Sequence, residues 1–164
     1  MKSTKRSKPS PVDAGPSWAD NAPSRRGRIL LVDDDLNVRE SLRDVLLQED
    51  YGVITAENGQ LALDLISQSA VDLVLLDLNM PVKNGWDTFE ALTAQFPLIP
   101  VIITTARPNQ LFTAVSAGVG ALLEKPIEIP VLLKTIDKLL AQSPEQHLAR
   151  LAGKEAEFHY HATG

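Results

Sequence analysis

Residues 71–81 read VDLVLLDLNMP, and this stretch decides the fold. Its first six residues are almost continuously apolar, which is typical of a strand that is covered on both faces of a parallel sheet. Asp77 follows this apolar run directly, and residues 78–81 have the composition of a turn. Because an aspartate at the end of a strand is often only a turn or capping residue, the rest of the chain decides whether Asp77 has a chemical role.

Segments of alternating strand and helix character surround this stretch. Five short apolar runs predict strands, at residues 28–32, 52–56, 71–76, 100–104 and 121–123. Each is followed by a segment with apolar residues at helical spacing, at residues 38–46, 61–66, 85–96, 109–117 and 129–140. Strands that alternate with short helices form parallel βαβ units with right-handed crossovers. The sequence therefore predicts one doubly wound α/β domain, at residues 28–141.

Charge is unevenly distributed along the chain, whose net charge is −5. Residues 1–28 carry seven basic and two acidic residues, and the rest carry nine basic and nineteen acidic residues. We expect residues 1–27 to form a disordered basic arm, because a segment rich in proline, serine and charge buries too little apolar surface to fold. Residues 142–164 are expected to form a C-terminal tail, partly helical. An acidic domain binds nucleic acid poorly, so no direct nucleic-acid contact is expected.

Composition also bears on the cellular compartment. The chain has no cysteine and no apolar run near the roughly 18–20 residues that a membrane-spanning helix needs. The N-terminal MKSTKRSKPS has no apolar segment behind it, as a secretory signal would have. We therefore expect a cytoplasmic protein without a membrane span.

Polar residues follow four of the predicted strands. The strands end on Asp33-Asp34-Asp35, Asp77, Thr104-Thr105 and Glu124-Lys125-Pro126. Ligands of open parallel sheets bind beyond the carboxyl ends of the strands, so these groups are expected at one site. Carboxylates that crowd together repel unless a cation neutralises them, and Mg²⁺ prefers oxygen ligands. The sequence therefore predicts a Mg²⁺ site at this edge of the sheet.

The same arrangement suggests a reaction. A carboxylate beside Mg²⁺ can attack phosphorus, which makes Asp77 a candidate nucleophile for forming an aspartyl phosphate. The Lys125 ammonium and the Thr105 hydroxyl would offset charge on the transferring group.

With these residues in order, the chain resembles the receiver domain of two-component response regulators. The matching motifs are the acidic pair after ILLV, LLDLNMP, Gly85, Thr105-Ala106 after PVIIT, and Lys125-Pro126. The resemblance covers about residues 28–141 and implies a flavodoxin-like fold with a five-stranded parallel sheet in the order 2-1-3-4-5. It also implies that the Lys125-Pro126 bond is cis. About 23 residues follow the last predicted helix, too few for a DNA-binding effector domain, so we expect the stand-alone, single-domain type.

The resemblance assigns roles to individual residues. Asp77 is the expected phosphoacceptor, with Thr105 as the switch hydroxyl and Lys125 as the ammonium that pairs with the phosphoryl group. The expected Mg²⁺ ligands are Asp33, Asp34, Asp77 and the backbone carbonyl of Asn79. The implied partners are a histidine kinase or histidine phosphotransfer protein, and a downstream protein that contacts residues 109–117, 121–123 and 129–140. The protein is expected to be a signalling phosphoacceptor and not an enzyme.

Three features bear on alternative functions of the chain. Leu122 stands where many receivers carry tyrosine or phenylalanine, which favours a phosphorylation-independent scaffold as the alternative function. A haloacid-dehalogenase-type phosphatase would also use a strand-end aspartate, but Asn37 stands where that pattern has threonine or valine. His159 and His161 are too few for a closed metal site.

Other charged residues have simpler interpretations. Asp35 is expected to cap the first helix. Glu124 should point to the face of the sheet opposite Lys125, because side chains alternate along a strand. Lys134 and Lys138 lie one helical turn apart and are expected to form a solvated face.

Overall fold

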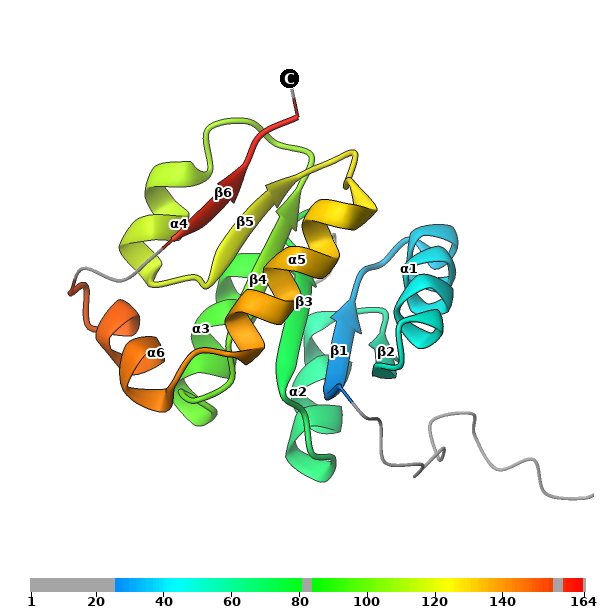
Figure 1. Ribbon diagram of the computed structural model, residues 1–164, viewed down its shortest axis with the longest axis horizontal. Helices are drawn as coiled ribbons and strands as arrows, with labels where there is room; N and C mark the ends of the chain where they lie inside the picture. The colour runs from blue at the N-terminus through cyan, green and yellow to red at the C-terminus, as the bar shows by residue number, and fades with distance from the viewer. Residues whose placement is uncertain (1–25, 81–83, 155–157, 164) are drawn as a thin grey trace, which may run out of the picture.

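The structure is a computed structural model that describes residues 26–80, 84–154 and 158–163, and its centre is a parallel sheet (Figure 1). The strands are β1 (Arg28–Val32), β2 (Gly52–Ala56), β3 (Leu73–Asp77), β4 (Val101–Thr105), β5 (Ala121–Glu124) and β6 (His159–His161). The helices are α1 (Leu36–Gln48), α2 (Gly59–Gln68), α3 (Gly85–Gln95), α4 (Leu111–Ala117), α5 (Ile129–Leu140) and α6 (Pro144–Leu151). The strands lie in the order β2-β1-β3-β4-β5-β6 and all pair in parallel.

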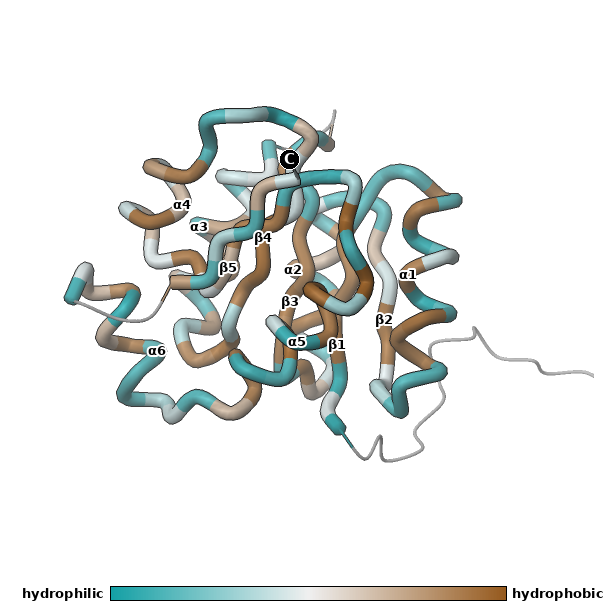
Figure 2. Tube along the Cα trace, turned by 45° about the horizontal axis from the view of Figure 1, so that its top comes forward, coloured by the Kyte–Doolittle hydropathy of each residue, from teal (hydrophilic) through white to brown (hydrophobic). Residues whose placement is uncertain are grey.

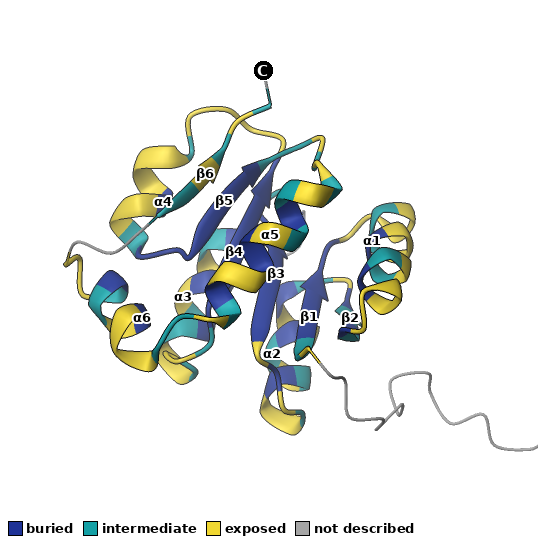
Figure 3. Cartoon of the chain, viewed as in Figure 1, coloured by how far each residue is buried: buried dark blue, intermediate teal, exposed yellow. Residues whose placement is uncertain are grey.

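Helices cover both faces of the sheet and form two apolar cores. On one face, Leu46 of α1 and Leu132 and Ile136 of α5 pack against alternate residues of the central strands. On the other face, α2, α3 and α4 pack against the remaining residues of the same strands. Hydrophobic residues therefore concentrate on β1, β3 and β4 (Figure 2), and these strands are almost fully buried (Figure 3). Burial on both faces explains why the residues from 73 to 76 are apolar without alternation.

Local capping fixes where the helices near the predicted site begin. Asp35 is the N-cap of α1, and its carboxylate accepts hydrogen bonds from the backbone N–H groups of Asn37 and Val38, which confirms the expected cap. Gly85 begins α3 at a place where a side chain would not fit: a Cβ there would lie 2.6 Å from the Cα of Leu78. The start of α3 therefore packs directly on the chain that leaves β3.

The prediction of five strands is wrong in number, although the order of the first five is confirmed. Residues 159–161 form β6, which pairs in parallel with the outer edge of β5 (Figure 1). A three-residue strand that reads His-Tyr-His has no apolar run to reveal it, so its pairing depends on the neighbouring edge and not on its own pattern.

The C-terminal residues are placed on the domain by α6. This helix begins with a capping box, in which Ser143 and Gln146 satisfy each other's backbone N–H groups. The helix packs against the turn after α4, where a Cβ on Gly118 would lie 2.8 Å from the Cα of Leu151. His147 and Arg150 are buried in this contact, and Arg150 donates to Gln142. Residues 144–151 of the predicted tail are thus helical and pack closely on the domain.

Most of the predicted basic arm, residues 1–25, lies outside the described residues. Arg26, which also belongs to the predicted arm, is among the described residues. Its guanidinium lies 2.6 Å from Asp137, 3.5 Å from Glu49 and 4.8 Å from the centre of the Tyr51 ring. Among the described residues, no helix is both long enough and apolar enough to cross a membrane.

Candidate phosphoacceptor site

The carboxyl ends of β1, β3 and β5 bring three charged side chains together. Asp33 follows β1, Asp77 is the last residue of β3, and each is only 2% exposed. Lys125 follows β5, and its ammonium nitrogen lies 3.1 Å from Asp33 Oδ2 and 3.5 Å from Asp77 Oδ1. Two buried carboxylates therefore share one cation at the edge of the sheet where these parallel strands end.

A third carboxylate completes an acidic cluster. Asp33, Asp34 and Asp77 each offer an oxygen atom, and these oxygens all lie within 4.8 Å of one another. Asp34 is exposed, whereas the other two are buried, so the cluster opens to solvent on one side. Three carboxylate oxygens open to water on one side are a donor set that suits Mg²⁺, which usually keeps several waters. The predicted carboxylate ligands thus fit the metal.

The electrostatics of the site make Asp77 unusual. Burial raises the pKa of Asp77, and the nearby Asp33 charge adds to this effect. The backbone N–H of Asn79, which donates to Asp77 Oδ1 at 3.1 Å, and the Lys125 ammonium lower the pKa but do not cancel the burial. For Lys125, burial lowers the pKa, but the Asp77 and Asp33 carboxylates outweigh it and the net pKa is raised. Lys125 therefore remains an ammonium at neutral pH.

Two predicted residues lie close to the cluster without joining it. Thr105 is buried at the end of β4, and its hydroxyl accepts a hydrogen bond from the backbone N–H of Arg107 at 3.0 Å. The side-chain oxygen of Asn79 is buried and has no hydrogen-bond partner within the described residues. The role predicted for Asn79 belongs to its backbone carbonyl and stays a prediction.

The site is supported by several contacts that the sequence analysis did not identify. The Arg39 guanidinium donates to the backbone carbonyl of Asp33 at 2.7 Å, and Asp33 Oδ1 accepts from the backbone N–H of Asp35 at 2.9 Å. Arg39 lies on α1, six residues after Asp33, and nothing in its sequence context distinguishes it from an ordinary exposed helix residue. The Lys125-Pro126 peptide bond is cis, as expected.

Leu122 and Glu124 face the α4 side of the sheet. Leu122 is fully buried in the core with Ala114 and Val119, so it acts as an apolar filler. In the register of β5 and β6 it lies beside Tyr160, whose hydroxyl donates to Glu124 at 2.9 Å. Glu124 thus points away from Lys125, as alternation along the strand predicts.

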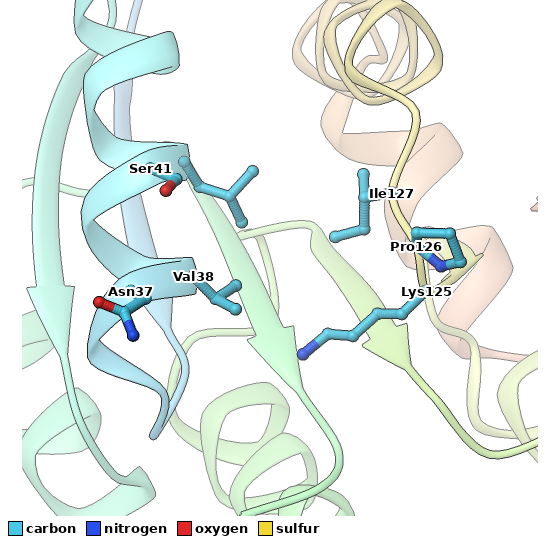
Figure 4. A pocket seen from close by; sticks show the side chains of 7 residues that line it. Asn37, Val38, Ser41, Lys125, Pro126 and Ile127 are labelled. Atoms are coloured by element: carbon cyan, nitrogen blue, oxygen red, sulfur yellow. The ribbon is translucent and has the colours of Figure 1, made fainter.

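A pocket of about 370 Å³ adjoins the site on the α1 side. Figure 4 shows Val38 of α1 facing Ile127 across this pocket, with Lys125 extending beside it. The remaining lining residues are Asn37, Ser41, Leu42 and Pro126. The predicted nucleophile therefore lies close to a largely apolar recess, which suits contact with another protein.

Comparisons with known proteins agree with this geometry. A family model described as the response regulator receiver domain matches residues 29–137. The transcriptional regulatory protein CpxR of Escherichia coli is 42% identical over 118 residues, covering 71% of this chain and 50% of CpxR. The response regulator MprA of a Mycobacterium species is 38% identical over 122 residues, covering 73% of this chain and 53% of MprA. The chain thus spans about half the length of these curated relatives.

Solved structures give the same result. A CheY-like receiver domain protein of Methanospirillum hungatei superposes with a TM-score of 0.67 at 28% identity, covering 70% of this chain and 93% of that one. The response regulator TrrA of Thermotoga maritima, in complex with Mg²⁺ and BeF, gives a TM-score of 0.65 at 32% identity, covering 69% of this chain and 98% of that one. The strand order, the charged residues at the strand ends and these matches lead to one conclusion: the chain belongs to the response regulator receiver domain family.

Proposed function

We propose that Asp77 is the phosphoacceptor of this receiver domain in two-component signalling. The observation that carries the proposal is the position of Asp77, buried at the end of β3 with the Lys125 ammonium 3.5 Å from Oδ1. Burial keeps water from this carboxylate, and the ammonium offsets the charge that an incoming phosphoryl group would bring. An exposed aspartate without these neighbours would have neither advantage.

The transfer is a displacement at phosphorus. A carboxylate oxygen of Asp77 forms the new O–P bond as the N–P bond of a phosphohistidine breaks, and the imidazole leaves with the bonding electrons and takes up a proton. Lys125 stays protonated and pairs with the phosphoryl oxygens. The Thr105 hydroxyl, on the neighbouring strand, would rotate away from Arg107 to donate to one of those oxygens. That rotation is the local event through which phosphorylation would change the surface near α4.

Asp33, Asp34 and Asp77 would hold Mg²⁺, with the backbone carbonyl of Asn79 as a further ligand. When bound, the ion would supply positive charge that neutralises the carboxylates and the transferring group. The structure supports this proposal through the oxygen cluster and its open side.

The phosphodonor would be a histidine kinase or a histidine phosphotransfer protein that docks on the recess beside Lys125. Val38, Pro126 and Ile127 give this recess an apolar lining on both sides (Figure 4). A helix that carries a phosphohistidine between apolar side chains would cover these residues and bring its phosphorus to the site from the open side.

Output through the face formed by α4, β5 and α5 is the second half of the proposal. In this chain β6 already pairs with the outer edge of β5, so a partner on that face would contact β6 as well. Several relatives are named transcriptional regulatory proteins, and the matched region is only about half their length, so the absence of direct nucleic-acid contact stays a prediction. The cytoplasmic location and the non-enzymatic role are also predictions from the sequence.

A phosphorylation-independent scaffold remains the second candidate. Leu122 favours it, because this buried aliphatic residue has no ring to move when Thr105 reorients. The complete set of charged residues at the strand ends favours the phosphoacceptor.

Intact-mass measurement after incubation with acetyl phosphate and Mg²⁺ separates the two candidates. The phosphoacceptor proposal predicts one phosphoryl adduct, which is absent in EDTA and in Asp77→Asn. Asp44→Asn, which changes an exposed carboxylate on α1, is the matched control and should be labelled like the unmodified protein. No labelling of the unmodified protein would favour the scaffold, and equal labelling of Asp77→Asn would contradict Asp77 as the phosphoacceptor.

A further inference from the structure

A second pocket, also of about 370 Å³, lies between α5 and β6 and shares no lining residue with the phosphoacceptor site. Four of its lining side chains can carry positive charge: Lys134, Lys138, His159 and His161. Two segments that are separated by about 20 residues of chain are thus brought together by the pairing of β6 with β5. Neither the lysine pair nor the histidine pair suggests a site by itself.

The fold explains why all four side chains line the same pocket. Lys134 and Lys138 are one turn apart and therefore lie on the same side of α5. His159 and His161 alternate with Tyr160, and they pair in register with Ala121 and Leu123, whose side chains pack against α5. Both histidines therefore face α5, while Tyr160 faces the α4 side and donates to Glu124.

The charges around this pocket differ from those of the rest of the domain. Beyond residue 28 the chain has nine basic and nineteen acidic residues, so basic side chains are a minority of its charged groups. Arg43 and Lys125 each lie within 4.0 Å of a carboxylate oxygen. In the parts of the chain that the structure describes, neither Lys134 nor Lys138 has a carboxylate within 4.0 Å.

Asp137 and Glu128 are the acidic residues closest in sequence to the two lysines, and each has another partner. Asp137 lies between them in sequence, but Arg26 and Tyr51 hold its carboxylate on another side of α5. Glu128 lies at the start of α5 and approaches His161, with 3.5 Å between Glu128 Oε1 and His161 Nε2. Two lysines that line a polar recess thus have no carboxylate partner among the residues that the structure describes.

We propose that this pocket binds a diphosphate group, either as free pyrophosphate or as part of a nucleoside diphosphate. Two lysines that are one turn apart match an anion with two charged centres, and lysine ammonium groups bind phosphate as point charges. The imidazoles of His159 and His161 line the opposite wall. The volume falls within the range of about 300–1,000 Å³ that is typical of small-molecule sites.

A metal site is a weaker interpretation of the same residues. His159 and His161 would supply two nitrogen ligands, and the Glu128 carboxylate lies 3.5 Å from His161. Among the described residues, however, these three side chains do not form a cluster with metal-ligand spacing, and two lysines line the same pocket. The ammonium groups of the two lysines would repel a metal cation and attract an anion.

Calorimetric titration in EDTA tests the proposal, because without a divalent metal the acidic cluster repels anions. We expect pyrophosphate to bind with saturation and one-to-one stoichiometry. The double variant Lys134→Gln with Lys138→Gln should weaken binding by about tenfold or more, because it removes two charge-assisted contacts. The control is Arg43→Gln with Lys154→Gln, which removes the same charge elsewhere and should bind like the unmodified protein.

Backbone amide NMR locates the site and separates the sources of the ligand. Pyrophosphate should shift the resonances of residues 134–138 and 159–161, and ADP that binds more tightly than pyrophosphate would identify a nucleotide as the source. Both results support the proposal. It is wrong if pyrophosphate fails to saturate at millimolar concentration, if both double variants lose affinity equally, or if the shifts map to residues 1–25. Saturable Zn²⁺ binding at His159 and His161 without pyrophosphate binding would also overturn it.

Discussion

Lys125 offsets an unfavourable feature of the fold, two carboxylates that are buried side by side. Its ammonium lies 3.1 Å from Asp33 and 3.5 Å from Asp77, so one cation faces two buried anions. The sequence predicted these three residues because each directly follows an apolar strand, and parallel strands end at a common edge. It did not predict that Arg39 supports the Asp33 carbonyl or that the Thr105 hydroxyl bonds to Arg107, because these contacts depend on loop geometry.

Repulsion within the acidic cluster should be measurable at Asp34. This exposed carboxylate lies near two buried ones, so Asp34→Asn removes like-charge repulsion. In EDTA the variant should gain about 0.5–1 kcal/mol in free energy of unfolding. In Mg²⁺ it should lose most of the stabilisation that the metal gives the unmodified protein. Thermal unfolding in both buffers, with Asp44→Asn as the control, provides the measurement, and equal Mg²⁺ stabilisation of both variants would contradict the assignment.

Tyr51 makes the stability of the protein sensitive to alkaline pH. Burial, together with the hydrogen bond to Asp137, raises the pKa of Tyr51 to about 12. Above pH 10 the unfolded chain loses this proton while the folded chain keeps it, so stability falls as pH rises from about 10 to 12. Two pKa units correspond to at most about 2.7 kcal/mol.

Tyr51→Phe should remove this part of the pH dependence. Urea denaturation at pH 8, 10 and 11.5 will show whether the variant's curve is flatter than that of the unmodified protein. Parallel curves would mean that Tyr51 is not the responsible group.

At the scale of elements, predictability followed the apolar pattern. The first five strands and their helices were predicted because each presents an apolar face of adequate length to one of two cores. The structure of the C-terminal residues was not predicted in this detail. The strand β6 has only three residues and no apolar run, and α6 buries His147 and Arg150 in place of aliphatic side chains. An edge strand of this kind is defined by its partner's free hydrogen-bonding groups.

Two glycines allow the packing of α6 to be measured. Gly118 and Gly153 have φ angles of +76° and +70°, so alanine introduces similar backbone strain at both. At Gly118 the new Cβ would lie 2.8 Å from the Cα of Leu151, whereas at Gly153 nothing lies within 4 Å. Gly118→Ala should therefore lower the free energy of unfolding by about 1–3 kcal/mol more than Gly153→Ala. Equal losses in urea denaturation would mean that α6 does not pack on this turn.

At the scale of the whole molecule, the recess beside α1 and the edge carrying β6 are separate surfaces on either side of Lys125. This separation would let a phosphodonor and an output partner bind in different places. Thr163 joins the second surface to the site, because its hydroxyl donates to the backbone carbonyl of Lys125 at 3.3 Å. A shift of the Lys125 backbone on phosphorylation would thus also move the residues that follow β6.

Blocking the recess should slow phosphorylation by a histidine kinase and leave phosphorylation by acetyl phosphate unchanged. Ser41 is an exposed residue of α1 at the recess, so Ser41→Arg adds a bulky charge there without disturbing the core. We expect this variant to lose about tenfold or more in the rate of transfer from a phosphorylated histidine kinase that labels the unmodified protein. Labelling by acetyl phosphate should not change. If both rates fall together, the recess acts on the chemistry and not on docking.

The position of the phosphoryl group is the most direct test of the central claim. After incubation with acetyl phosphate and Mg²⁺, borohydride converts an aspartyl phosphate to homoserine, and peptide mass spectrometry then identifies the modified residue. The account predicts homoserine at residue 77 alone, and none without acetyl phosphate or without Mg²⁺. Homoserine at residue 33 or 34, or none at any position, would contradict the assignment of Asp77 as the phosphoacceptor.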